Sequence, residues 1–191
     1  MRLGIAHHLG WAIAVTASAD HVVLDRRRIE LIGPELPAAP IHHLGGAHAM
    51  HASPDALRDD DALAGLVAQV RESAARVTAE SLDELEHDLP GPVTLLSVRA
   101  WPAGFPTDIS VLRRAPYESR ADSVMYCQVL AEAAGARGWR VHLYDARRVE
   151  QEAADVLGTR AQEVLHGPRA LLGPPWTKDH RIALAATVIA Q

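Results

Sequence analysis

The sequence predicts one α/β domain built on a mixed five-stranded sheet, with a three-strand antiparallel meander, two parallel strands and helices on both faces. Two observations predict this fold class. The first thirty or so residues contain three short apolar runs separated by turn residues, which is typical of a meander. After them, segments with helical spacing alternate with short apolar runs, which is typical of parallel strands joined by helices.

The meander begins with two runs, 2–6 and 11–16, that are apolar on both faces. This pattern is typical of strands buried in the middle of a sheet. The third run, 21–31, carries Asp25 and three arginines, and we expect an edge strand there because charge on an edge prevents aggregation. The histidine-containing segment 7–10 is predicted to turn between the first two strands.

Two further strands are predicted over 93–98 and 139–144, where short apolar runs follow helical patterns. The connections 33–54 and 99–117 are rich in proline and are predicted to be irregular. Helices are predicted to begin at potential capping residues, namely Asp59, Ser119 (with Asp122 in a capping box), Asp145, Thr159 and Thr177.

Composition restricts the class of protein. The 191 residues are 48% hydrophobic and 23% charged, which is ordinary for a globular domain with a real core. No apolar run approaches the roughly 18 residues needed to cross a bilayer, and no secretory leader is recognised. The single cysteine, Cys127, is predicted to be buried and unable to form an intramolecular disulfide, so a cytoplasmic location is expected. The net charge of −5 and the 4% aromatic content disfavour a dedicated nucleic-acid binder with a multi-base stacking platform.

Three segments carry a family pattern in order along the chain. They are the opening LGIAHHLGWAIAV, the central ADSVMYCQVLAEAAGARGWRVHLYDARRVEQEAADVLG, and the tail KDHRIALAATVIA. In this order they resemble the first hairpin, a helix-strand-helix unit and the final helix of the RNase H-like superfamily, specifically the RuvC-type Holliday-junction resolvases. The resemblance implies a single RNase H-like domain over 1–191, in which the first strand ends near the start of the last helix.

The resemblance also implies a nuclease site that this sequence does not complete. Family nucleases use four carboxylates to hold two divalent metal ions about 4 Å apart, which activate water and stabilise the leaving oxygen. Here the first acid falls at Ala6, the second within 96–98, which has no acid, and the fourth at Ile182, so only Asp179 matches. One carboxylate cannot form a Mg²⁺ site, and two-metal nuclease chemistry is therefore not expected.

A site with histidine ligands is another possibility at the same place. The family geometry would bring His7 or His8 close to Asp179 and His180, with Asp179 and His180 as catalytic candidates. Ligands His7, His8 and Asp179 would suit Zn²⁺, Mn²⁺ or Fe²⁺ better than Mg²⁺. The alternative is that the two adjacent histidines only end a hairpin, because their side chains point apart, and that Asp179 only stabilises a helix start.

A histidine-rich segment and several arginines supply further candidates. If 47–51 forms a helical turn, His48 and His51 share a face and could bind a metal, together with His42 and His43 nearby; a polar loop is the alternative. Arginines could contact phosphates on an RNase H-like scaffold, or could simply be solvated charge. The arginines concerned are Arg113, Arg114, Arg147 and Arg148, with Arg26, Arg27 and Arg28 on the third predicted strand.

These observations favour a binding or regulatory module, for a protein or nucleic-acid partner, that keeps an RNase H-like scaffold without its two-metal nuclease site. The alternative is a repurposed metal-dependent nuclease or hydrolase that uses His7, His8, Asp179 and His180. No membrane partner is expected. A homo-oligomer formed through the apolar helices is a further possibility.

Overall fold

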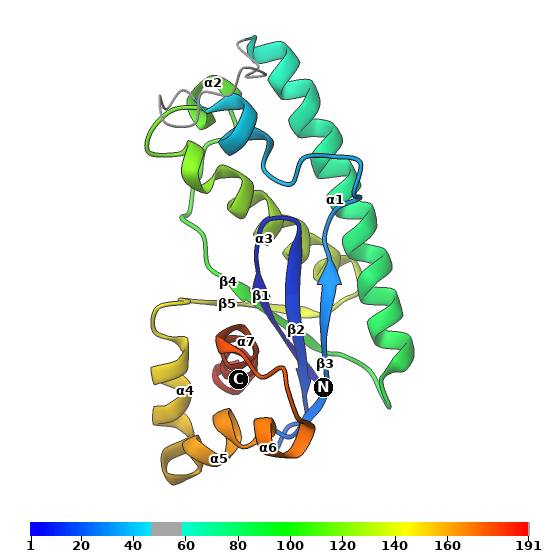
Figure 1. The fold of residues 1–191 in the computed structure, drawn as a ribbon, viewed down its shortest axis with the longest axis vertical. Helices are drawn as coiled ribbons and strands as arrows, with labels where there is room; N and C mark the ends of the chain where they lie inside the picture. Colours follow the sequence, from blue (N-terminus) through cyan, green and yellow to red (C-terminus); the bar gives the residue numbers. More distant parts are fainter. Residues whose placement is uncertain (47–58, 191) are drawn as a thin grey trace.

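The computed structural model describes residues 1–46 and 59–190, and within these ranges the chain forms a five-stranded sheet with helices on both faces (Figure 1). The predicted α/β class is thereby confirmed. The strands are β1 (Arg2–His7), β2 (Trp11–Ala17), β3 (Val23–Glu30), β4 (Leu95–Arg99) and β5 (Arg140–Tyr144).

The first strand lies at the centre of the sheet, whose strand order is β3-β2-β1-β4-β5. β1 pairs antiparallel with β2, which pairs antiparallel with β3, because short turns join these three strands. On its other side β1 pairs parallel with β4, and β4 pairs parallel with β5, so longer helical connections are needed there. The meander and the two parallel strands are therefore as predicted, and β1 joins them.

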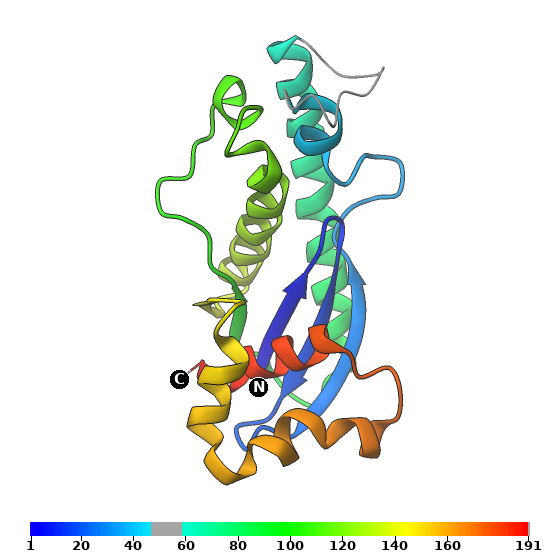
Figure 2. The same ribbon diagram turned by 60° about the vertical axis from the view of Figure 1, so that its left-hand side comes forward.

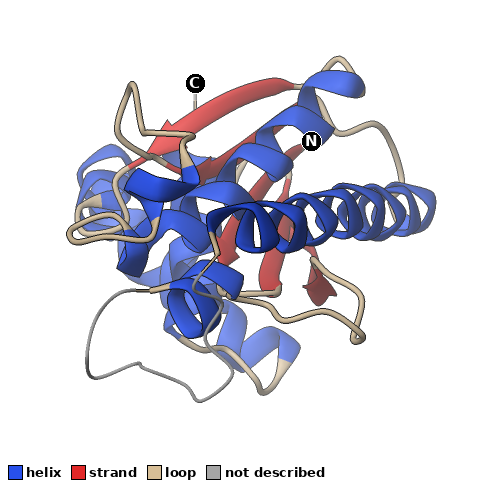
Figure 3. Cartoon of the chain, turned by 90° about the horizontal axis from the view of Figure 1, so that it is seen from above, coloured by secondary structure: helices blue, strands red, loops and turns tan. Residues whose placement is uncertain are grey.

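Different helices cover the two faces of the sheet (Figures 2 and 3). α1 (Asp60–Asp88) and α3 (Glu118–Ala136) pack on one face, and α7 (Lys178–Ile189) packs on the other with α4 (Val149–Leu157) and α5 (Ala161–His166). The shorter elements are η1 (Ile41–Gly45), α2 (Ile109–Leu112), η3 (Gly158–Arg160) and α6 (Pro168–Leu172). No helix within 1–46 and 59–190 combines the length and apolar character needed to cross a membrane.

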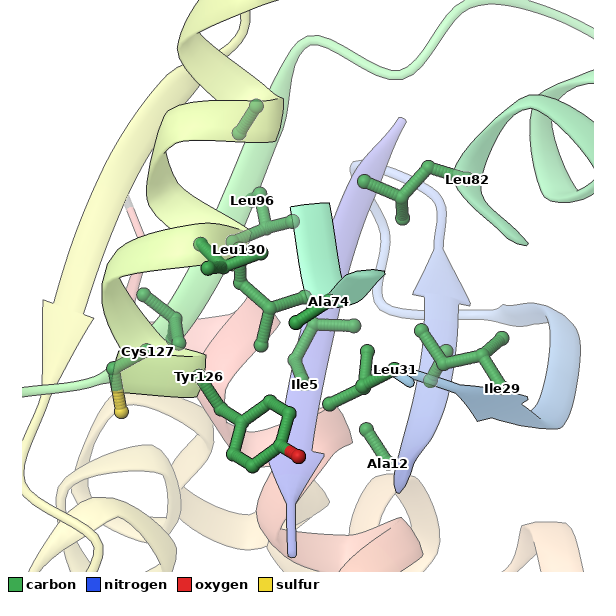
Figure 4. Close-up of a cluster of buried hydrophobic side chains, with 14 of the residues drawn as sticks. Ile5, Ala12, Ile29, Leu31, Ala74, Leu82, Leu96, Tyr126, Cys127 and Leu130 are labelled. Carbon is green, nitrogen blue, oxygen red and sulfur yellow. The ribbon is translucent and has the colours of Figure 1, made fainter. Parts of the chain in front are cut away.

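Alternation along β1 divides the core in two. Leu3 and Ile5 face α1 and α3, where they join a cluster that includes Tyr126 and Leu130 (Figure 4). Ala6 faces the opposite side and joins the apolar cluster under α7. Because successive side chains of a strand point to opposite faces, the central strand supplies both cores.

The α7 helix lies directly against β1 at Gly4. An alanine side chain at Gly4 would overlap the backbone carbonyl of Ala183 on α7 and touch the Thr187 methyl group. Glycine is therefore required at this point so that the helix can lie directly against the strand. This close approach fixes the position of the start of α7 relative to the end of β1.

Some of the predicted helix starts are wrong. α3 begins at Glu118, after a turn in which Tyr117 N–H donates to Arg114, so Ser119 does not cap it. Its predicted capping-box partner, Asp122, instead accepts backbone N–H bonds from Ile41 (3.2 Å) and His42 (2.9 Å) at the start of η1. The connection that was predicted to be irregular thus contains a short helix that a carboxylate of α3 anchors.

Two caps in the second half of the chain are also misplaced, and one is correct. Asp145 accepts from Arg147 N–H in a turn, and α4 begins four residues later, at Val149. Thr159 lies in η3 instead of capping α5. Thr177 is the N-cap of α7, as predicted.

Candidate functional site

The carboxyl ends of the three parallel strands meet at one edge of the sheet. β1, β4 and β5 end there at His7, Arg99 and Tyr144. In α/β sheets, ligands bind outside the carboxyl ends of parallel strands, where connecting segments leave polar groups exposed. This carboxyl edge of the sheet is therefore the candidate site.

The two adjacent histidines point to opposite sides of the sheet. The alternation that sends Ile5 to one face and Ala6 to the other continues to the strand end. His7 consequently faces α3, and His8 faces α7. The structure therefore does not bring both imidazoles into one site.

His7 belongs to a small polar cluster with α3. Its Nε2 lies 3.0 Å from Ser123 Oγ and 3.5 Å from Cys127 Sγ. Burial lowers the pKa of His7 to about 4, with a further contribution from the nearby Arg99 charge. Burial also raises the pKa of Cys127 to about 12, so this thiol is protonated and unreactive, in agreement with the prediction that it is buried.

His8 lies at the same edge of the sheet as His7, on the face that α7 covers. Its Nε2 lies 3.1 Å from Asp179 Oδ2, so the end of β1 does meet the start of α7. The imidazole also stacks on Trp11, with ring centroids 4.1 Å apart, and the Arg28 guanidinium lies 4.4 Å from the centroid of the Trp11 ring. Three flat side chains thus form a layered stack beside the strand end.

The predicted metal site at His7, His8 and Asp179 is not assembled. His7 turns away from the other two, and within 1–46 and 59–190 no three His, Cys, Asp or Glu side chains are grouped to hold a metal ion. His180, a predicted catalytic residue, is buried and its Nδ1 accepts from Thr177 N–H in the α7 cap. Its side chain therefore has a structural partner. The histidines His48 and His51 lie outside the described residues.

The positions that would carry acids in the family nucleases are filled by other groups. Ala6 and Ile182 belong to the apolar cluster under α7. Ser97 is fully buried, and its hydroxyl donates to the Ala186 carbonyl at 2.9 Å. These three positions therefore supply no carboxylate, the side-chain group on which a site for a hard cation mainly depends.

Several of the predicted phosphate-binding arginines already contact carbonyl or carboxylate groups of the protein. Arg113 donates to the Gly45 carbonyl and pairs with Asp60, which ties α2 to η1 and α1. Among the β3 arginines, Arg26 donates to carbonyls of 172–175, and Arg27 pairs with Asp25 and Asp88. Arg28 joins the stack with Trp11 and pairs with Glu30. Arg114, Arg147 and Arg148 are exposed; Arg148 pairs with Glu152 at 3.2 Å.

Sequence reasoning missed three members of the carboxyl edge. Arg99 ends β4, and Arg120 and Ser123 lie on the first turns of α3. Arg99 could have been found, because it directly follows a buried strand and thus lies at the edge where ligands bind. Arg120 and Ser123 could not, because only the packing of α3 on β1 brings them there.

The depressed pKa of His7 predicts a specific loss of stability in acid. The unfolded chain binds this proton near pH 6.5 and the folded chain near pH 4, so stability falls as pH decreases through this interval. We expect His7→Gln to remove up to about 1.4 kcal/mol per pH unit of that dependence. Urea unfolding of both proteins at pH 7, 6 and 5 measures it. Parallel curves would contradict the neutral state assigned to His7.

Comparison with known proteins adds no relatives to this description. No protein family model, no curated protein and no solved structure matches the chain.

Proposed function

We propose that this chain is an RNase H-like protein that binds nucleic acid at the carboxyl edge of its sheet and does not cleave it. Three features support the RNase H-like part. The meander precedes two parallel strands, the first strand is central, and its end meets the start of the last helix at His8 and Asp179. These are the relations that the sequence resemblance implies.

The filled space under α7 is the observation that carries the non-nuclease part of the proposal. Two-metal hydrolysis of phosphodiesters needs several carboxylates around two cations. Ala6, Ser97 and Ile182 stand at three of the four implied positions. The fourth, Asp179, already has His8 as its partner. A hydrolase that uses His7, His8, Asp179 and His180 receives less support, because His7 and His180 are held in different contacts.

Positive charge at the carboxyl edge supports a phosphate-bearing ligand. Four arginines are exposed there: Arg99 ends β4, Arg120 lies in the first turn of α3, and Arg147 and Arg148 follow β5. The chain as a whole carries a net charge of −5, yet four arginines gather around this edge, where Asp179 pairs with His8 and Glu152 pairs with Arg148. Arginine recognises phosphate oxygens through paired N–H donors, and such contacts hold a nucleic-acid backbone without reading its sequence.

The layered stack of His8, Trp11 and Arg28 supports nucleic acid over other phosphate-bearing ligands. His8 is exposed, with 43% of its side-chain surface accessible, and Trp11 supports it from one side. Flat side chains beside a basic edge are the arrangement on which single-stranded bases stack. One base on His8 would need no multi-base platform, so the low aromatic content does not oppose this proposal.

Binding of a fluorescein-labelled single-stranded 20-mer, measured by anisotropy over a salt series, tests the proposal. We expect Arg147→Ala/Arg148→Ala to weaken binding about tenfold or more and to reduce the salt slope by about 1.4, because two phosphate contacts are lost. Arg140→Ala/Arg169→Ala is the matched control. This control removes the same charge away from the carboxyl edge. Arg140 is the first residue of β5, at the opposite end of that strand, and Arg169 lies on α6.

Two outcomes would contradict the proposal. Equal binding of the 20-mer by the test and control variants would show that the carboxyl edge does not bind nucleic acid. Cleavage of single-stranded or four-way-junction DNA with Mg²⁺ or Mn²⁺, abolished by Asp179→Ala, would show that a nuclease site had been retained.

A further inference from the structure

A small polar cavity lies beside His7 at the carboxyl edge. Its volume is about 90 Å³, and its lining includes Arg99, Trp101, Ser119, Arg120 and Ser123. Cavities that enclose a drug-sized ligand have roughly 300–1,000 Å³. This cavity therefore suits one small polar group and not a whole nucleoside.

The charge of the cavity lining is entirely positive. Two guanidinium groups, Arg99 and Arg120, contribute to the lining, and no lining residue in the described ranges is acidic. The inner wall carries no compensating negative charge, because burial raises the pKa of Cys127 to about 12 and its thiol stays protonated. An anion in the cavity would therefore meet two full positive charges and no opposing carboxylate.

The neutral donors around the cavity suit an oxyanion. Ser119 and Ser123 supply hydroxyl groups, and His7 Nε2 lies 3.0 Å from Ser123 Oγ, which orients that hydroxyl. The hydroxyl of Ser119 and the two guanidinium groups can together donate more hydrogen bonds than the roughly four lone-pair sites of a carboxylate accept. A phosphate monoester presents three terminal oxygens and up to two negative charges, which matches two arginines and two serines.

We propose that this cavity binds the terminal phosphate of a phosphate monoester. Where that phosphate is the 5′ end of a nucleic-acid strand, the inference rests on the proposed function, and the strand would continue from the cavity toward Arg147 and Arg148. A free phosphate ester is the other source of the same chemistry. The experiments below separate these sources.

The first experiment compares 5′-phosphorylated and 5′-hydroxyl 20-mers of one sequence by anisotropy. We expect the phosphorylated strand to bind at least tenfold more tightly, and Arg99→Gln/Arg120→Gln to bring the ratio close to one. Arg147→Ala/Arg148→Ala should weaken both strands and keep the ratio. Both cavity arginines are exposed, so their replacement should leave the fold intact, which circular dichroism checks. The control Arg140→Gln should leave both affinities unchanged.

The second experiment uses inorganic phosphate as the probe and the His7 imidazole as the reporter. Phosphate bound between the arginines should raise the pKa of His7 from its value of about 4, because an anion favours the imidazolium form. An NMR titration of the His7 ring protons, with and without phosphate, measures this change. The same titration of Arg99→Gln/Arg120→Gln should show no effect of phosphate.

The outcomes distinguish the two proposals. Phosphate sensitivity of His7 without binding of any strand would support the cavity, identify a free phosphate ester as the ligand, and overturn the proposed nucleic-acid function. Equal binding of both strands, with no response of His7 to phosphate, would overturn the cavity proposal and leave the proposed function standing. The cavity proposal would also be overturned if Arg99→Gln/Arg120→Gln still bound the 5′-phosphorylated 20-mer more tightly than the 5′-hydroxyl 20-mer. The phosphate would then bind elsewhere.

Discussion

Gly4→Ala is expected to destabilise the protein by about 3 kcal/mol or more, because the added methyl group overlaps the Ala183 carbonyl on α7. The clash is with backbone, so a side-chain rotation cannot relieve it. Either β1 bends within a sheet where it pairs on both sides, or α7 moves away from the core. Urea unfolding followed by circular dichroism measures the loss.

Gly65→Ala is the matched control for this substitution. Gly65 lies in the interior of α1, and within 1–46 and 59–190 a Cβ there would meet no atom within 4 Å other than those of its chain neighbours and its own helix backbone. The same chemical change should therefore stabilise the protein by roughly 0.5–1 kcal/mol, as alanine favours helix more than glycine does. Gly4→Ala with wild-type stability would show that α7 does not lie directly on β1, and the contact between His8 and Asp179 would lose its structural basis.

Asp122→Ala is expected to destabilise the protein by about 2 kcal/mol or more at neutral pH. The substitution leaves the N–H groups of Ile41 and His42 without their acceptor, and an orphaned buried donor costs about 1–3 kcal/mol. Removal of a buried charge offsets part of this cost. Asp59→Ala, which removes an exposed cap from α1, is the control and should cost about 1 kcal/mol.

The cost of Asp122→Ala should depend on pH. Burial raises the pKa of Asp122 to about 6, from 3.8 in the unfolded chain, so the folded state binds more protons between these values. This carboxyl group therefore contributes more stability at pH 4 than at pH 7, and its contribution falls as pH rises through 6. Chemical unfolding at pH 4.5 and 7.5 should accordingly give a larger difference between wild type and variant at pH 4.5. A larger difference at pH 7.5 would contradict this assignment.

Local patterns in the sequence predict most of the sheet and some of the helix caps. The apolar runs of 2–6 and 11–16 identify β1 and β2 to within a residue at each end, because strands buried on both faces leave an unambiguous signal. The sequence also predicts Thr177 as the N-cap of α7. It does not predict that His180 accepts the Thr177 N–H in the same cap. A histidine three residues after a cap is not the Glu or Gln of the usual capping box.

Apart from the local errors at Asp145 and Thr159, the failures concern residues whose partners lie far away in the sequence. Asp122 fits a local capping box, yet it accepts from residues about 80 positions earlier, and no local pattern encodes that choice. The approach of His8 to Asp179 followed from the family resemblance and not from spacing. The separation of His7 from His8 was predictable, because the period of two residues in β1 already assigns them to opposite faces.

Because β1 is central, the segments that pair with it or cover it are synthesised at very different times. Its hairpin with β2 uses neighbouring residues, whereas its partner β4 and the covering helix α7 are synthesised about 90 and 180 residues later. During translation, the Gly4 and Ala6 side of β1 has no cover until 178–189 leaves the ribosome. Contacts of such long sequence separation form late, and unpaired strand surface favours aggregation. Nascent chains arrested before α7 should therefore depend on chaperones, and chains arrested after α7 has left the ribosome should not.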